Sequence, residues 1–114
     1  MSKQEEKDFP PIDVTMIDGI DKYIHEPSRL KILAHLYVLE HTDFTYLKNL
    51  TSFSWGRLSS HLDKLKEAGY VHLEKKLVKK SKKGKETPKT FISLTEKGRN
   101  AFENYRNAMK QLFS

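Results

Sequence analysis

The sequence predicts a single α+β domain, a helical core completed by a β-hairpin and extended by helices at both ends. Three observations support this fold class. Leucines recur at helical spacing through residues 27–68, strand-like segments at 70–78 and 90–94 flank a run of lysines, and the C-terminal segment is again amphipathic at helical spacing. We therefore expect a flexible N-terminal arm, residues 1–14, and one domain over residues 15–114.

Four helices are predicted before the hairpin. Two of them cover residues 15–24 and 27–40, and Pro27 limits the continuation of the first. A third, over residues 44–50, is joined to the fourth by a tight turn at residues 51–53. A helix, a short turn and a second helix in this order form a helix-turn-helix motif, in which the second helix can enter a DNA groove.

That second helix is predicted over residues 54–68. Ser54 can accept a hydrogen bond from a free backbone N–H group of the first turn, and Gly69 supplies a left-handed stop. Its buried stripe consists of three leucines at spacings of four and three: Leu58, Leu62 and Leu65.

The front of this helix is predicted to be basic and rich in hydrogen-bonding groups, without a carboxylate: Arg57, Ser60, His61 and Lys64. A helix with a leucine back and such a front suits the DNA major groove. The alternative is an ordinary amphipathic helix whose front is only solvated. The lysine-rich segment later in the chain favours DNA.

Residues 79–89 contain no large apolar residue, and they carry six lysines: Lys79, Lys80, Lys82, Lys83, Lys85 and Lys89. With a strand on each side, this segment is predicted to be the basic tip of a two- or three-stranded β-hairpin wing. Because it contains no arginine, we expect phosphate contacts more than sequence reading. A flexible charged loop or a localisation-type basic run is the alternative.

The net charge of +6 is concentrated in the same part of the chain. Residues 1–53 hold six cations and nine acids, whereas residues 54–89 hold eleven cations and four acids, a net charge of +7. Residues 90–114 add four cations and two acids. A localised basic field of this kind indicates binding of a polyanion.

The last helix is predicted from a cap at Thr95 to about Phe113. Its distal apolar stripe, together with that of the N-terminal helix, exceeds what one small domain needs to close its core. We therefore expect a homodimer joined through the terminal helices, with intramolecular packing of those helices as the alternative. The predicted seam residues are Ile17, Ile20, Ile24, Tyr105, Met109 and Leu112.

Several other classes are disfavoured by the sequence. The absence of cysteine excludes disulfides, thiolate metal sites and a cysteine nucleophile. His41 and Asp43 lie together in a predicted turn, but no third ligand stands at a suitable spacing, so no metal and no cofactor is expected. Neither a membrane span nor a signal-peptide apolar region is found, and a cytoplasmic location is expected.

A family resemblance rests on three stretches: RLKILAHLYVLE, FTYLKNLTSFSWGRLSSHLDKLKEAGYV and ISLTEKGRNAF. Together they resemble the winged helix-turn-helix transcriptional regulators of the ArsR and MarR type, over about residues 17–113. The resemblance implies a homodimeric regulator that binds double-stranded DNA. The metal-sensing branch of these regulators uses cysteines near the recognition helix, and this chain has none.

The resemblance also implies which residues meet DNA. In addition to the wing, residues 79–89, it assigns seven positions on the recognition helix: Ser54, Trp55, Arg57, Ser59, Ser60, His61 and Lys64. Trp55 is bulky for a base-reading position, and contact with a sugar or with a neighbouring subunit are its alternatives.

The expected function is that of a sequence-specific, duplex-DNA-binding transcriptional regulator without enzymatic activity. The main alternative is a winged-helix protein-interaction module that does not bind specific DNA. An enzyme is disfavoured because no paired carboxylates, nucleophile–base set or glycine-rich phosphate loop is present. RNA is a variant that the charge alone leaves open. The sequence identifies neither an operator nor a small-molecule effector.

Overall fold

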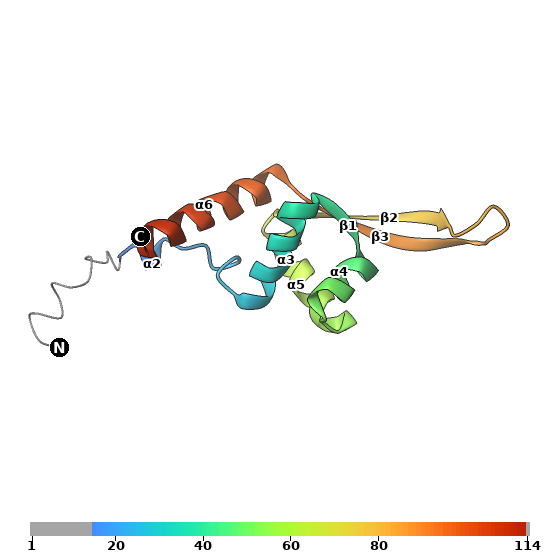
Figure 1. Ribbon diagram of the computed structural model, residues 1–114, viewed down its shortest axis with the longest axis horizontal. Helices are drawn as coiled ribbons and strands as arrows, with labels where there is room; N and C mark the ends of the chain where they lie inside the picture. The colour runs from blue at the N-terminus through green and yellow to red at the C-terminus, as the bar shows by residue number, and fades with distance from the viewer. Residues whose placement is uncertain (1–14, 114) are drawn as a thin grey trace, which may run out of the picture.

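The computed structural model describes residues 15–113, and it has the expected α+β winged-helix architecture (Figure 1). The proposed arm, residues 1–14, lies outside the described residues. In chain order the elements are α2 (Thr15–Asp18), α3 (Pro27–Leu39), β1 (His41–Asp43), α4 (Phe44–Thr51), α5 (Trp55–Glu67), β2 (Val71–Lys79), β3 (Glu86–Leu94) and α6 (Glu96–Phe113).

The helix-turn-helix consists of α4 and α5, and local signals define its limits. The Asp43 carboxylate accepts the backbone N–H of Tyr46 at the start of α4, and Ser52 ends this helix in the left-handed region at φ 61°. The Ser54 hydroxyl then accepts the backbone N–H of Arg57, which confirms it as the cap of α5. Gly69, with φ 79°, follows α5 and confirms the predicted left-handed stop.

The sheet is antiparallel, and its strand order is β1-β3-β2. The prediction of a turn at residues 41–43 was wrong, because this segment forms the short strand β1 against residues 91–93 of β3. Three polar or charged residues carry little strand signal of their own, and their conformation follows from pairing with a distant segment. The wing therefore rests on a three-stranded base.

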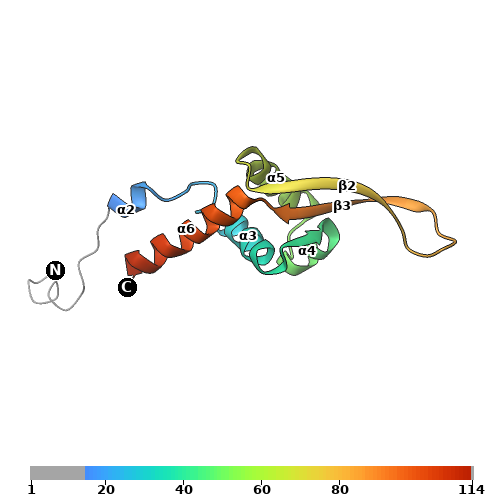
Figure 2. The same ribbon diagram turned by 90° about the horizontal axis from the view of Figure 1, so that it is seen from above.

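The hairpin is also longer than predicted. β3 begins at Glu86 instead of Thr90, and β2 and β3 pair continuously from Val71–Leu94 to Lys79–Glu86. The turn at the tip is thus confined to residues 80–85, and the stem projects well beyond the helices (Figures 1 and 2). The prediction missed the stem because residues 86–89 contain no large apolar side chain.

The core lies where α3, α4 and α5 pack under the sheet and the first turns of α6. All three leucines predicted for the back of α5 are buried in it. The buried apolar residues of the described chain are Ile24, Ile32, Leu33, Leu36, Leu47, Phe53, Leu58, Leu62, Leu65, Tyr70, Val71, Ile92 and Phe102.

The N-terminal helix is shorter than the predicted residues 15–24, since α2 ends at Asp18. Beyond it, the Asp21 carboxylate accepts the backbone N–H groups of Tyr23 and Ile24, an arrangement that competes with helical hydrogen bonding. At the other end of the domain, α6 runs for 18 residues away from the wing (Figure 1).

The end of α5 is joined directly to the start of α6. The Thr95 N–H donates to the Tyr70 carbonyl at 3.0 Å, and the Thr95 hydroxyl donates to the Gly69 carbonyl at 2.5 Å. The same hydroxyl accepts the Gly98 N–H at 2.9 Å, and therefore caps α6 as predicted. Gly98 is needed here because a Cβ at that position would lie 2.1 Å from the Tyr70 carbonyl oxygen.

Candidate nucleic-acid interface

The outer surface of α5 is polar and accessible. Ser54, Ser59, Ser60 and Lys64 are exposed, while the leucines on the opposite side are buried. Gly56 has open space around its Cα, so that another molecule can approach the backbone closely at the first turn of α5. These residues form a continuous candidate surface for a major groove.

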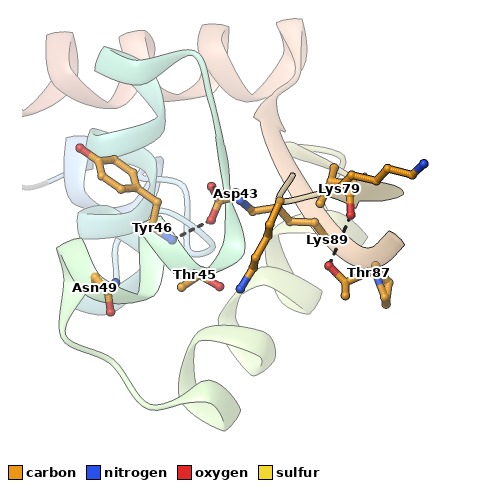
Figure 3. Close-up of a pocket in the computed structure, with 10 residues that line it drawn as sticks. Asp43, Thr45, Tyr46, Asn49, Lys79, Thr87 and Lys89 are labelled. Atoms are coloured by element: carbon orange, nitrogen blue, oxygen red, sulfur yellow. Dashed lines mark hydrogen bonds and ion pairs between the residues drawn. The ribbon is translucent and has the colours of Figure 1, made fainter. Parts of the chain in front are cut away.

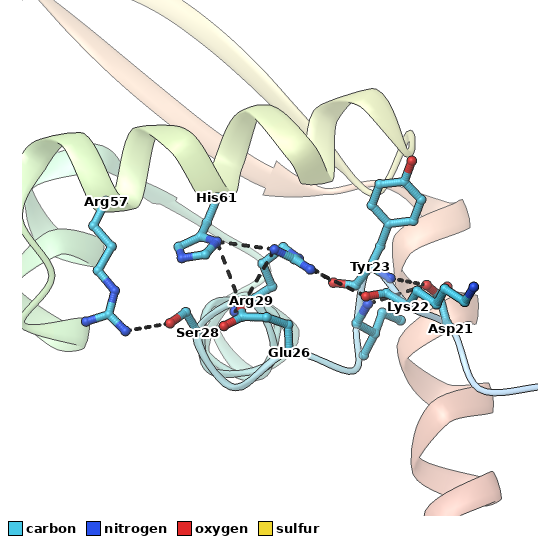
Figure 4. A network of polar contacts seen from close by, with 9 residues as sticks. Asp21, Lys22, Tyr23, Glu26, Ser28, Arg29, Arg57 and His61 are labelled. Carbon is cyan, nitrogen blue, oxygen red and sulfur yellow. Dashed lines mark hydrogen bonds and ion pairs between the residues drawn. The ribbon is translucent and has the colours of Figure 1, made fainter. Parts of the chain in front are cut away.

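Arg57 is part of this surface, but one edge of its guanidinium is already bound. Its Nη2 donates to the Ser28 hydroxyl at 2.6 Å (Figure 4). The guanidinium carbon lies 4.2 Å from the centre of the Phe53 ring. Ser28 is buried at the first turn of α3. Arg57 is exposed overall, so its remaining N–H groups can meet a ligand in a direction fixed by these two contacts.

His61 was predicted on the open front of α5, but its side chain turns towards α3. Its Nδ1 lies 3.4 Å from Nη1 of Arg29 and 3.8 Å from a carboxylate oxygen of Glu26 (Figure 4). Burial lowers the pKa of His61 from its ordinary 6.5; Glu26 opposes this, and the charges of Arg29, Arg57 and Lys64 add to it. His61 is therefore predominantly neutral near pH 7 and ties α5 to α3.

Glu26 organises the same cluster from below. Its carboxylate accepts the Arg29 N–H at 2.7 Å and so caps α3, while the Arg29 side chain donates to the Tyr23 carbonyl. Burial works to raise the pKa of Glu26, but hydrogen bonds from the Arg29 and Ser28 backbones and the nearby positive charges outweigh it, and the pKa is lowered from 4.5.

The prediction of an acid-free front was wrong. Asp63 and Glu67 are both exposed on α5, at steps of 100° per residue that place them among Gly56 and Ser60, opposite the leucine stripe. The predicted front instead contained Arg57 and His61, which lie on the flank facing α3. The interface thus has mixed charge along α5, and its excess of positive charge comes mainly from the wing.

Trp55 is the first residue of α5 and is 57% exposed. Its ring stacks on Phe44 at 5.2 Å with an angle of 3° between the planes, and the Lys48 ammonium lies 5.1 Å from its centre. Both partners belong to α4, so Trp55 links the two helices of the motif. Trp55 therefore has a structural role within its own chain, in addition to the predicted contact with a base, a sugar or a neighbouring subunit.

The wing lysines occupy two settings. Lys80, Lys82, Lys83 and Lys85 lie in the tip and are exposed, whereas Lys79 and Lys89 belong to the strands of the stem. The Lys89 ammonium lies 3.4 Å from the Asp43 carboxylate, and this contact holds its side chain against the start of α4.

A groove runs between the helix-turn-helix and the stem of the wing. One part, about 620 Å³, lies between α4 and the stem (Figure 3), and a second, about 580 Å³, lies between α5 and the stem. The two parts share Thr45, Pro88 and Lys89. Sequence reasoning missed the α4 side of this groove, Thr45, Tyr46 and Asn49, because three polar residues on a short helix carry no distinctive pattern.

The predicted dimer seam needs one clear correction. Ile24 is fully buried in the core of its own chain, so it cannot form an intermolecular contact. Tyr105 packs against the same core, with its hydroxyl 3.0 Å from Nδ1 of His25. Ile17 is 50% exposed; Ile20, Met109 and Leu112 are half-buried, and the structure leaves their part in a seam as a prediction.

Residues 15–113 contain neither a cluster of metal ligands nor a membrane-spanning helix. Within this range, no group of three or more His, Asp or Glu side chains is placed to hold a metal ion. No helix of the same range has the length and apolar character needed to cross a membrane.

The sequence of the winged-helix region matches known proteins. Residues 28–113, which are most of the described chain, match the family described as the winged helix DNA-binding domain. The protein belongs to this family. It is also 43% identical over 91 residues to the uncharacterized protein MJ0432 of Methanocaldococcus jannaschii, an alignment that covers 80% of this chain and 92% of the relative.

Solved structures share the fold. A transcriptional regulator homologue from Pyrococcus horikoshii aligns with a TM-score of 0.75 and 21% identity, covering 85% of this chain and 92% of the other. A MarR-family regulator from Silicibacter pomeroyi aligns with a TM-score of 0.57 and 16% identity, over 86% and 61% of the two chains. AbfR, solved in its reduced form bound to DNA, aligns with a TM-score of 0.60 and 18% identity, over 76% and 56%.

Proposed function

We propose that this protein is a cytoplasmic transcriptional regulator that binds specific sequences of duplex DNA as a homodimer. The observation that carries the proposal is the placement of two surfaces on one winged-helix frame. An accessible polar helix, α5, lies beside a long hairpin whose tip bears four exposed lysines. The first surface suits base edges, and the second suits phosphates.

In this proposal α5 enters the major groove and its exposed residues discriminate between bases. Ser59, Ser60 and Lys64 are open to a ligand, and Arg57 presents its free edge beside them. The six wing lysines contact the phosphate backbone. His61 supports the interface from behind, because it is directed towards α3.

A homodimer is part of the proposal because one recognition helix covers only a short stretch of bases. Two such helices related by a two-fold axis can read half-sites about 10 bp apart. The exposed apolar residues at the ends of the chain, Ile17 at 50% and Phe113 at 78% exposure, are candidates for the seam together with Met109 and Leu112.

The alternative is a winged-helix module that binds another protein and no specific DNA. A neutral or acidic wing would favour it, whereas the wing tip here is rich in lysine. The fold shared with AbfR, which has been solved bound to DNA, also favours DNA as the partner.

The deciding experiment is a selection of bound duplexes from a genomic library by the purified full-length protein at a stated salt concentration. We expect enrichment of a common site made of two inverted half-sites. Recovery of duplexes with no shared sequence, at every salt concentration tested, would contradict specific binding and favour the alternative.

A further inference from the structure

Three polar side chains connect α5 with the N-terminal end of α3, and together they form the His61 cluster (Figure 4). His61 projects from α5, Arg29 lies in the first turn of α3, and Glu26 caps this helix. The His61 Nδ1 lies 3.4 Å from Nη1 of Arg29, and one Glu26 carboxylate oxygen lies 3.8 Å from each of these two nitrogens. The cluster is largely shielded from water, since only 17% of the His61 side chain and 12% of the Arg29 side chain are exposed.

We propose that the His61 cluster is a pH-sensitive contact, at which protonation of His61 weakens the attachment of the recognition helix to α3 and so reduces the discrimination between specific and random DNA. The inference rests on the proposed function and adds a regulatory signal to it. It assigns a role to Arg29 and Glu26, which lie outside the surfaces that meet DNA.

Arg29 holds the cluster together through several hydrogen bonds. Its Nε donates to the Tyr23 carbonyl at 2.7 Å, and its Nη2 donates to the Lys22 carbonyl at 3.4 Å. Its Nη1 faces the His61 Nδ1. A guanidinium can only donate, so Nδ1 must be the accepting, unprotonated nitrogen of a neutral imidazole. Arg29 therefore connects the recognition helix with the segment that precedes α3.

Protonation of His61 removes the acceptor of this contact, because both nitrogens of a charged imidazole donate. Two positive groups then face each other at 3.4 Å, and both are attracted to the Glu26 carboxylate. The same carboxylate accepts the Arg29 backbone N–H at 2.7 Å and so caps α3. A shift of Glu26 towards the charged His61 therefore weakens the cap and loosens the first turn of α3.

The first turn of α3 also fixes the direction of Arg57. Ser28, between Glu26 and Arg29 in the chain, accepts the Arg57 Nη2 at 2.6 Å. When the turn loosens, this anchor is lost. Base discrimination depends on directed contacts, whereas binding to phosphates depends on charge. The charged form of His61 should therefore weaken specific binding and leave random binding unchanged or stronger.

The surroundings of His61 determine the pH at which the contact changes. Burial is the largest influence, and it lowers the pKa of His61 from 6.5. The positive charges of Arg29 on α3, and of Arg57 and Lys64 on α5, act in the same direction. Glu26, at the start of α3, opposes them. The contact therefore stays intact at neutral pH and is lost under acid conditions.

The test measures affinity for the selected duplex and for a random duplex from about pH 7.5 to about pH 5. For the wild type, the ratio of the two affinities should fall by up to about tenfold for each pH unit over which His61 becomes charged, the limit for one proton. NMR of the free protein gives a readout without DNA. The Arg29 backbone amide signal should move upfield, as it loses the Glu26 carboxylate, with the same midpoint as the His61 ring signals.

Three variants complete the experiment. H61N places an amide oxygen close to the position of Nδ1 and cannot be protonated in this range, so the affinity ratio should be nearly constant with pH. The matched control H72N changes an exposed histidine of β2 and should retain the wild-type pH dependence. E26Q keeps an acceptor for the cap but removes the charge that favours the protonated His61, and should move the transition to lower pH. Urea unfolding at about pH 7.5 verifies that each variant is folded.

Three outcomes would overturn the inference. If H61N loses discrimination on acidification as the wild type does, another group is the sensor, although specific binding stands. If the Arg29 amide signal does not follow the titration of His61, protonation does not disturb the cap of α3, whatever the DNA affinities do. If the wild type prefers no duplex at about pH 7.5, the proposed function fails and the pH-dependent discrimination fails with it.

Discussion

The guanidinium of Arg57 and the buried hydroxyl of Ser28 are joined by a hydrogen bond of 2.6 Å, which ties the recognition helix to the first turn of α3. The bond leaves part of the guanidinium available on an exposed surface. The orientation of Arg57 is therefore set before a ligand arrives, and this can be tested by changing either partner.

Arg57→Ala is expected to weaken binding to the selected duplex by about 1–3 kcal/mol and to random duplex by much less, if Arg57 contacts a guanine through two N–H groups. Ser28→Ala keeps the charge and removes only the anchor, so its effect should be smaller and confined to the selected duplex. Competition titrations measure both. An equal loss on the two DNAs would assign Arg57 to a phosphate instead.

Changing Lys82, Lys83 and Lys85 together to alanine should weaken binding to specific and random duplexes alike. Each lost phosphate contact should reduce the slope of log K against log salt concentration by up to about 0.9. The control is Lys110→Ala, an exposed lysine on α6 far from the wing. If the triple variant retains the wild-type slope, the wing tip does not contact the phosphate backbone of DNA.

Gly98→Ala should destabilise the protein by about 1–3 kcal/mol or more, because its Cβ would lie 2.1 Å from the Tyr70 carbonyl oxygen. The matched control is Gly56→Ala, because a Cβ at Gly56 meets nothing within 4 Å. The higher helix propensity of alanine should raise the free energy of unfolding of this variant by about 0.5–1 kcal/mol. The midpoint of urea unfolding should therefore fall for Gly98→Ala and rise for Gly56→Ala. Equal behaviour would contradict the close approach of α6 to Tyr70.

Acidification should destabilise the protein partly through His61. Since the pKa of His61 is lowered in the folded state, the unfolded chain binds this proton more readily, and stability is lost as the pH falls from about 6.5 towards the lowered value. His61→Gln should reduce the difference in unfolding free energy between about pH 7.5 and about pH 5.5. The control is His72→Gln, at an exposed position of β2. If His72→Gln reduces the pH dependence of stability more than His61→Gln does, His61 is not its source.

Leu112→Asp should dissociate the proposed homodimer, because it places an unpaired carboxylate in an apolar seam. Asn107→Asp adds the same charge at an exposed position of α6 and should have little effect. Sedimentation equilibrium at low micromolar concentration measures both variants. A wild type that is already monomeric would rule out the dimer, and a dimeric Leu112→Asp variant would move the seam elsewhere.

The parts of the fold that were predicted correctly depend on neighbours within a few residues. Ser54 and Thr95 cap their helices, Gly69 adopts its left-handed conformation, and the leucines of α5 are buried. Caps, turns and helical periodicity are local properties, and so they can be read from consecutive residues.

Several errors concern contacts between distant segments, whereas the early end of α2 and the acidic residues on the front of α5 are local features. β1 exists only because residues 91–93 pair with it, and Ile24 is buried because the chain after α2 turns back onto the core. The same applies to the candidate site, where Ser28 and Glu26 turn Arg57 and His61 towards α3. Spacing along α5 could not indicate which side of the helix meets α3.

Thr95, which caps α6, is hydrogen-bonded to Gly69 and Tyr70, the residues that follow the recognition helix. The end of α5 and the start of α6 are therefore in direct contact, although the hairpin separates them in the sequence. These hydrogen bonds fix the C-terminal end of α5 to the start of α6. The far end of α5, 13 residues from this joint, is about 20 Å away. If two copies meet through α6, a change in the orientation of α6 is carried to α5, and a rotation of about 10° about the joint displaces the far tip of α5 by about 3.5 Å. In such a dimer, a change in the crossing of the two α6 helices would alter the spacing between the two recognition helices.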